Sequence, residues 1–139
     1  MSDVYTVINL NTYIMFKAML IAGLGGFLGT CGRYLVGKLA HHLFTSPFPY
    51  GTFAVNIIGS LIIGILFGLA EKTHLISTNM NIFLITGFCG GFTTFSSFAD
   101  DMYLLLQNKN WGYFTVYLGL SIVLGILLVW LGRSLVKPA

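Results

Sequence analysis

The chain has 139 residues, of which 56% are hydrophobic and 8% charged, and its mean hydropathy is +0.86. Soluble domains carry about a quarter charged residues, so this composition excludes a water-soluble globular protein. Seven Lys or Arg residues against four Asp or Glu residues give a formal charge of +3. These charges are spread over predicted loops and chain ends rather than gathered into the basic stripe that binds nucleic acid, which excludes a nucleic-acid partner.

The uncharged gaps between the charged residues are long enough to cross a membrane. A helical crossing needs about 20 predominantly apolar residues. The gaps predict four such spans, at residues 18–39, 51–70, 82–106 and 113–131. The sequence therefore predicts an all-α membrane protein with a single four-span domain in the lipid bilayer.

Residues 1–16 form an N-terminal extension ahead of the first predicted span. They contain Asp3 and no basic residue, whereas a signal peptide begins with a positively charged region. We therefore expect the first span to be retained, and no role is assigned to the extension.

The basic residues do not select an orientation in the membrane. Four spans place Lys17, Lys72, Arg133 and Lys137 on one side and Arg33, Lys38 and Lys109 on the other. The positive-inside rule acts through an asymmetry in this count, and four against three is hardly an asymmetry. Either the bias is too weak to see by counting, or the chain inserts both ways and pairs with its inverted copy. Four spans are too few to enclose a polar pathway within one chain, and inverted repeats are common in transport folds. The second interpretation therefore predicts an antiparallel, dual-topology homodimer.

The first predicted span is rich in glycine, and Gly25 with Gly29 forms a GxxxG pattern that is typical of close helix packing. Arg33 lies inside the end of this span. Its guanidinium either reaches the lipid headgroups or holds positive potential at the mouth of an anion path. Both interpretations stay open, because an arginine in a membrane is costly unless something compensates for it.

In the second predicted span, Thr52, Asn56 and Ser60 recur every four residues and therefore share one helical face. Asn56 is the only carboxamide of this span. It either joins two helices by hydrogen bonding or donates to a ligand that moves past it. Ser60, Gly64 and Gly68 continue the same row as a ridge of small residues, so this face is expected to serve both helix packing and polarity.

The third predicted span contains the string GFCGGFTTFSSF between Gly87 and Phe98. Adjacent glycines and adjacent threonines are poor helix formers, so the string predicts a break in the helix; the alternative is an unbroken, glycine-rich packing helix. An unwound segment at membrane depth frees carbonyl groups that can hold a cation. After the break, Phe95 and Phe98 share a face beside Thr94 and Ser96, and the electropositive edges of their rings can stabilise an anion.

The fourth predicted span carries hydroxyl groups at spacings of four, at Tyr113, Tyr117 and Ser121. Tyr113 is close enough to the end of the span to belong to the aromatic belt at the membrane surface, but Tyr117 and Ser121 are deeper. Together with Asn56 they predict a track of hydrogen-bond donors. Donors without fixed cations suit an anion that must leave as readily as it enters.

Three strings of the sequence match one known family. They are Gly25-Gly26-Phe27-Leu28-Gly29 followed by Arg33-Tyr34, then Pro49-Tyr50-Gly51-Thr52 followed by Val55-Asn56 and Gly59, and finally the string from Gly87 to Phe98. Over nearly its whole length from Gly23 onwards, the chain resembles the bacterial Fluc/CrcB fluoride channels.

This resemblance implies an antiparallel, dual-topology homodimer in the bacterial inner membrane, with two fluoride pores and one buried Na⁺ at its centre. It implies that backbone carbonyls of Gly90 and Thr93 from both subunits hold the Na⁺. The pore and anion-binding residues that it implies are Asn56, Phe95, Phe98, Ser96, Thr94, Thr52, Tyr117, Ser121 and Arg33. The chain departs from the family at Gly125, where some relatives have a serine, and at Asp101, where relatives often have glutamate.

The expected function is therefore a fluoride-selective channel that exports fluoride passively and lowers its cytoplasmic level, with a Na⁺ that is not transported. One alternative is a small proton-coupled multidrug exporter, which needs a membrane-embedded carboxylate; the candidates Asp100 and Asp101 lie near the end of the third predicted span. A second alternative is a non-transporting subunit of a membrane complex, which explains the glycines but not the polar rows. An enzyme is not expected, because the sequence contains no nucleophile and base pair or cluster of His and carboxylate residues.

Overall fold

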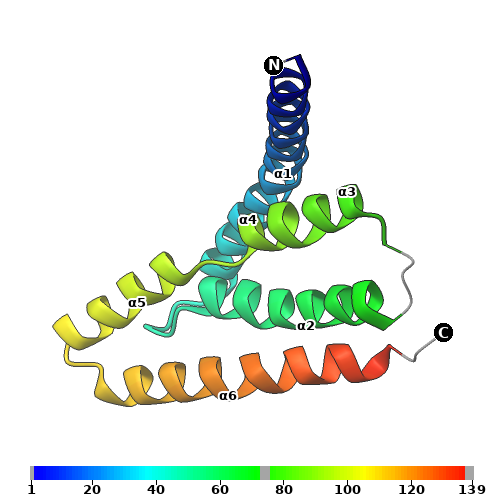
Figure 1. Ribbon diagram of the computed structural model, residues 1–139. Coiled ribbons are helices and arrows are strands. Elements are labelled where there is room, and N and C mark those ends of the chain that lie inside the picture. The colour runs from blue at the N-terminus through cyan, green and yellow to red at the C-terminus, as the bar shows by residue number, and fades with distance from the viewer. Residues whose placement is uncertain (1, 73–75, 137–139) are drawn as a thin grey trace.

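The structure is a computed structural model that describes residues 2–72 and 76–136, with the side chains of residues 2–8 left aside. Its helices in chain order are α1 (Ser2–Leu43), α2 (Tyr50–Lys72), α3 (Thr78–Asn81), the π-helix η1 (Ile82–Cys89), α4 (Gly90–Phe92), α5 (Phe95–Gln107) and α6 (Trp111–Leu135) (Figure 1). These described residues form no strand. The all-α prediction is thus confirmed for this part of the chain; His74 and Lys137 lie outside it.

Four segments are long and apolar enough to cross a membrane: Asn9–Leu43, Tyr50–Lys72, Thr78–Gln107 and Trp111–Leu135. Each contains one of the four predicted spans, which confirms their number and order. The first segment is much longer than predicted, because α1 has 42 residues and begins at Ser2. At 1.5 Å per residue this helix is roughly 63 Å long, about twice the thickness of the hydrocarbon core. Residues 2–16 therefore continue the helix of the first span, and the N-terminal half of α1 projects away from the other helices (Figure 1).

Helix α1 packs against η1 through glycines on both partners. A Cβ atom at Gly25 would overlap the carbonyl oxygen of Phe83, and a Cβ atom at Gly29 would overlap the carbonyl oxygen of Phe88. Backbones approach this closely only where a side chain is missing. The packing role predicted for the GxxxG pattern is therefore confirmed.

Helices α2 and α6 run side by side in the same direction (Figure 1). A Cβ atom at Gly64 would lie 2.5 Å from the carbonyl oxygen of Val129, and one at Gly132 would lie 2.6 Å from the carbonyl oxygen of Leu61. A Cβ atom at Gly68 would lie 3.0 Å from a methyl group of Val136. The packing role predicted for the ridge is thus confirmed at Gly64 and Gly68, and their partner is the fourth span.

The third span is broken, and the break falls on the two threonines. Helix α4 ends at Phe92, and the next two residues are extended, with φ −84° and ψ 159° at Thr93 and φ −153° and ψ 123° at Thr94. The backbone N–H and the hydroxyl of Thr93 both donate to the carbonyl oxygen of Cys89, at 2.9 Å each. Thr94 then starts α5, since its hydroxyl accepts a 3.2 Å hydrogen bond from the backbone N–H of Ser97. The alternative of an unbroken packing helix is therefore wrong.

Candidate functional site: a groove at the helix break

The break is held open by Asn56 of α2. Its side-chain Nδ2 donates to the carbonyl oxygen of Thr94 at 3.0 Å, and its Oδ1 accepts from the backbone N–H of Thr94 at 2.8 Å. The amide thus replaces the two backbone partners that Thr94 would find in a continuous helix. Of the two interpretations of Asn56, the joining of two helices by hydrogen bonding is present in the structure. The Nδ2 group carries a second hydrogen, which these bonds do not use.

A groove of about 430 Å³ opens beside this bridge. It is lined by residues of α2, of the break, of α5 and of α6, namely Asn56, Gly59, Ser60, Ile63, Thr93, Thr94, Phe95, Phe98, Ser121 and Ile122. The structure therefore brings five of the predicted anion-binding residues together on one wall: Asn56, Thr94, Phe95, Phe98 and Ser121. These ten lining residues carry no charged side chain.

The two predicted phenylalanines form one side of this groove. Their ring centroids are 6.1 Å apart and their planes are inclined at 41°. Phe95 is 80% exposed, so its ring projects from the protein rather than into its core. Ser96 is the second residue of α5, and its hydroxyl oxygen lies 3.3 Å from that of Thr94.

The Ser121 hydroxyl is a buried donor with no hydrogen-bond partner among the described residues. It lines the groove at the break and also a second groove of about 600 Å³, which continues along α6 past Gly125. A buried hydroxyl without a partner loses free energy relative to water. Ser121 is thus placed to donate to a ligand in either groove.

Tyr117 lies behind this wall rather than on it. Its side chain is 0% exposed, its ring packs 5.0 Å from that of Phe98, and its hydroxyl donates to the Asp101 carboxylate at 3.2 Å. Thr52 lines a small pocket together with Asp101. The two predicted residues Tyr117 and Thr52 therefore both lie near Asp101, and neither of them lines the groove at the break.

Of the remaining predicted residues, Arg33 and Gly90 lie apart from the groove, whereas Thr93 is one of its lining residues. Arg33 is half-buried on α1, lines neither groove, and has no ion-pair partner among the described residues. Gly90 is exposed, and a Cβ atom there would meet nothing within 4 Å. Because the Thr94 N–H donates to Asn56, the Gly90 carbonyl has lost its α-helical donor. Thr93, three residues on, is extended.

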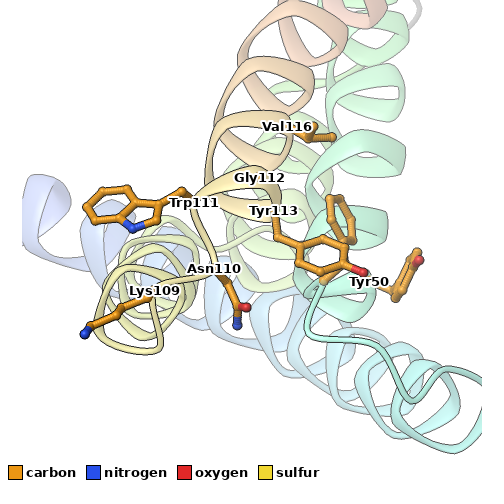
Figure 2. Close-up of a pocket in the computed structure, with 8 residues that line it drawn as sticks. Tyr50, Lys109, Asn110, Trp111, Gly112, Tyr113 and Val116 are labelled. Atoms are coloured by element: carbon orange, nitrogen blue, oxygen red, sulfur yellow. The ribbon is translucent and has the colours of Figure 1, made fainter.

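A separate hollow of about 730 Å³ lies where α5 turns into α6. Figure 2 shows Tyr113 and Tyr50 on one side of it, while Lys109 and Trp111 point the other way. Aromatic side chains and lysine are the usual residues at a membrane surface. The hollow therefore agrees with the aromatic-belt interpretation of Tyr113 and shares no lining residue with the groove at the break.

Sequence reasoning missed two members of the site. Ser60 lines both grooves and its hydroxyl donates to the backbone carbonyl of Asn56 at 2.7 Å; its spacing of four from Asn56 was the available signal, but it was assigned to packing. Asp101 was considered as a departure from the family and as a candidate carboxylate of an exporter, but not as a partner of Tyr117. Nothing in the local sequence shows that Tyr117, 16 residues away, donates to it.

The fold and site define a small four-span membrane protein with an uncharged, donor-lined groove at a broken helix. Residues 20–133 match the family model described as CrcB-like protein, Camphor Resistance (CrcB). The chain belongs to this family, which confirms the resemblance seen in its sequence.

Curated relatives cover most of the chain. A protein of Chlorobium luteolum is 46% identical, covering 87% of this chain and 93% of its own length, and one of Bacteroides fragilis is 46% identical, covering 86% and 95%. A protein of Flavobacterium psychrophilum is 40% identical, covering 87% and 98%. Each of these relatives bears the name fluoride-specific ion channel FluC.

Proposed function

We propose that this protein is a fluoride-selective channel that lets fluoride leave the bacterial cell by passive electrodiffusion through the inner membrane. The observation that carries the proposal is the groove at the helix break, which combines donors with phenyl rings on an uncharged wall. The names of the relatives support fluoride as the anion. No enzymatic step is part of this function.

The wall offers what a small anion needs in place of water. Transfer of an isolated small ion into a low-dielectric interior costs on the order of tens of kcal/mol. The Ser121 hydroxyl, the second Nδ2 hydrogen of Asn56 and the edge of the exposed Phe95 ring can donate to fluoride in series. Because no fixed cation lines the groove, fluoride is not trapped there. A membrane potential of 100 mV, negative inside, then favours exit by about 2.3 kcal/mol.

The groove calls for a second copy of the chain to close it. Phe95 is 80% exposed, and large apolar side chains such as Leu24 and Ile126 are exposed on α1 and α6. An antiparallel, dual-topology homodimer would cover such surfaces and would form two equivalent pores. The nearly equal distribution of basic residues between the two sides of the membrane supports this arrangement.

A Na⁺ between the two copies fits the carbonyl groups at the break. Hard cations take oxygen ligands, and the described residues contain no group of three or more His, Cys, Asp or Glu side chains that could hold a metal. The exposed Gly90 carbonyl and that of Thr93, supplied by both copies, are the proposed ligands. Such an ion would add fixed positive potential near the pores without being transported. In this arrangement Arg33 belongs to the vestibule, and Tyr117 and Thr52 support the donor track.

The Asp101 carboxylate is the one observation that favours a proton-coupled exporter. It lies within the third span and receives a hydrogen bond from the buried Tyr117. However, Asp101 does not line the groove at the break. A coupled exporter would require a proton gradient for transport, whereas a channel would not.

Fluoride efflux from proteoliposomes tests the proposal. Purified protein is reconstituted in liposomes loaded with fluoride or with chloride, and valinomycin with K⁺ carries the balancing current. We expect fluoride efflux, little chloride efflux and no dependence on an imposed proton gradient. Absence of fluoride efflux from a well-folded protein would refute the channel, and a strict requirement for a proton gradient would support the exporter instead.

A further inference from the structure

The second groove leads from the helix break to a charged end of the protein. It shares Ser60, Ser121 and Ile122 with the groove at the break, and it ends at Arg133. Ser121 and Arg133 are 12 residues apart on α6, roughly 18 Å at 1.5 Å per residue. A continuous wall therefore connects the proposed anion site with the end of the span.

This end of the wall is electrostatically unfavourable for an anion unless it is compensated. Helices α2 and α6 both end here, side by side (Figure 1), and each helix C-terminus carries the equivalent of about half a negative charge. The Lys72 ammonium group compensates part of this charge, since it donates to the carbonyl oxygens of Arg133 at 2.7 Å and Val136 at 2.9 Å. The carbonyl end of α6 is thus neutralised by a cation from α2.

The guanidinium of Arg133 adds a second cation, which is fixed in place. Its Nη1 donates to the Glu71 carboxylate at 2.7 Å, and the group lies 5.0 Å from the centre of the Phe67 ring. The side chain is 40% exposed, so it faces the water at the end of the span. Arg133 is the only charged residue among the eight that line the second groove.

We propose that Arg133 sets the positive potential at this mouth of the fluoride path and that Glu71 limits it. The inference rests on the proposed channel function. Held by Glu71 and Phe67 at the rim, the guanidinium attracts fluoride from solution but does not enter the groove, where a cation would trap the anion. A mouth lined by one sign of charge raises the local concentration of its counter-ion and thereby the rate of capture.

The competing explanation is that Arg133 only fastens α6 to α2. The two explanations make different predictions for the two members of the ion pair. If the pair is only a fastener, Arg133→Gln and Glu71→Gln remove the same contact and must act in the same direction. If Arg133 supplies positive potential, Arg133→Gln removes the attraction for fluoride, whereas Glu71→Gln removes the negative charge that weakens this attraction. The two variants must then change the efflux rate in opposite directions.

The experiment measures fluoride efflux in proteoliposomes at low ionic strength for both variants and for the unmodified chain. We expect Arg133→Gln to slow efflux roughly threefold and Glu71→Gln to accelerate it by a similar factor. Both differences should shrink when an impermeant salt is raised well above 0.1 M, where the screening length falls below about 10 Å. Arg133→Lys, which keeps the charge, should retain most of the rate.

Two controls separate the possible failures. Gel filtration and thermal unfolding in detergent establish that each variant folds, and the double variant Arg133→Gln/Glu71→Gln shows the effect of losing the contact without a change in net charge. Effects of the same sign, or no effect at low salt, in variants that fold would overturn the role of Arg133. Absence of fluoride efflux from the unmodified chain would instead overturn the proposed function.

Discussion

Asn56 and Thr94 exchange two hydrogen bonds across 38 residues of sequence. The Asn56 carboxamide pairs with both the backbone N–H and the backbone carbonyl of Thr94, which lies in the helix break. In a bilayer no water is present to satisfy these backbone groups, and each would be left unpaired at a cost of several kcal/mol. The side chain of Asn56 therefore stabilises the break as well as lining the groove.

Replacement of Asn56 should impair both of these roles. Asn56→Ala leaves both Thr94 groups without partners, at about 1–3 kcal/mol each, and should reduce the free energy of unfolding by roughly 2–6 kcal/mol, with loss of fluoride efflux. Asn56→Asp keeps an acceptor for the Thr94 N–H but places a second carboxylate oxygen against the Thr94 carbonyl, so it should fail similarly. Thermal unfolding in detergent and efflux in liposomes measure the two effects.

Ser60→Ala is the matched control, because Ser60 donates to the carbonyl of Asn56 on its own helix and supports no break. Its effect on unfolding should stay below about 1 kcal/mol. An Asn56→Ala variant as stable as the unmodified chain would show that the bridge does not support the break.

The exposed Phe95 ring should contribute to conduction through its edge rather than its volume. Phe95→Leu keeps an apolar side chain but removes the electropositive edge, an interaction worth roughly 1 kcal/mol, so fluoride efflux should fall about fivefold. Phe88→Leu is the matched control, since the Phe88 ring stacks on that of Phe92 at 5.6 Å and does not line the groove. If both variants conduct equally fast, the ring edge has no part in permeation.

The sequence was sufficient for the spans and the break, because both depend on local composition. The uncharged gaps give the approximate bounds of the spans. The GG and TT pairs are both poor helix formers, but only the two threonines leave the helix, since Gly90 and Gly91 belong to α4. The start of α1 was not predictable in the same way. Lys17 bounds the uncharged gap, but a helix can continue beyond the membrane past a charged residue, and α1 begins at Ser2.

The site was predictable in its residue types but not in its contacts. Spacings of four place Tyr117 and Ser121 on one helical row, yet Ser121 lines the groove whereas Tyr117 is buried against Phe98 and Asp101. Successive residues at a spacing of four rotate by about 40° around a straight helix, so a row drifts from one neighbour to the next. Which neighbour is met depends on tertiary packing, which a single sequence does not specify.

Gly125 interrupts the row of hydroxyls after Ser121, and the structure leaves space to restore it. A Cβ atom at Gly125 would lie 3.7 Å from the Ser60 hydroxyl oxygen, an ordinary contact distance. Gly125→Ser adds a donor on the wall between the break and Arg133 and should raise fluoride efflux roughly twofold without loss of stability. Efflux and thermal unfolding of purified protein test both statements.

Two further variants make the Gly125 experiment specific. Gly125→Ala fills the same space without a hydroxyl and should leave efflux near that of the unmodified chain. Gly132→Ser adds the same group on the same helix, but its Cβ would lie 2.6 Å from the carbonyl oxygen of Leu61 and should destabilise the protein. Equal efflux for Gly125→Ser and Gly125→Ala would show that this position is not on the path.

The contact that Gly29 makes between α1 and η1 should be sensitive to any added side chain. Gly29→Ala places a Cβ atom onto the carbonyl oxygen of Phe88 and 2.8 Å from the backbone nitrogen of Phe92. Neither atom is part of a flexible side chain, so the backbones must separate, at a cost of roughly 1–3 kcal/mol. Gly23→Ala lies on the same helix with nothing within 4 Å and should stabilise it by up to about 1 kcal/mol through helix propensity. Unfolding midpoints in detergent should therefore move in opposite directions, and a Gly29→Ala midpoint at or above that of the unmodified chain would contradict the contact as described.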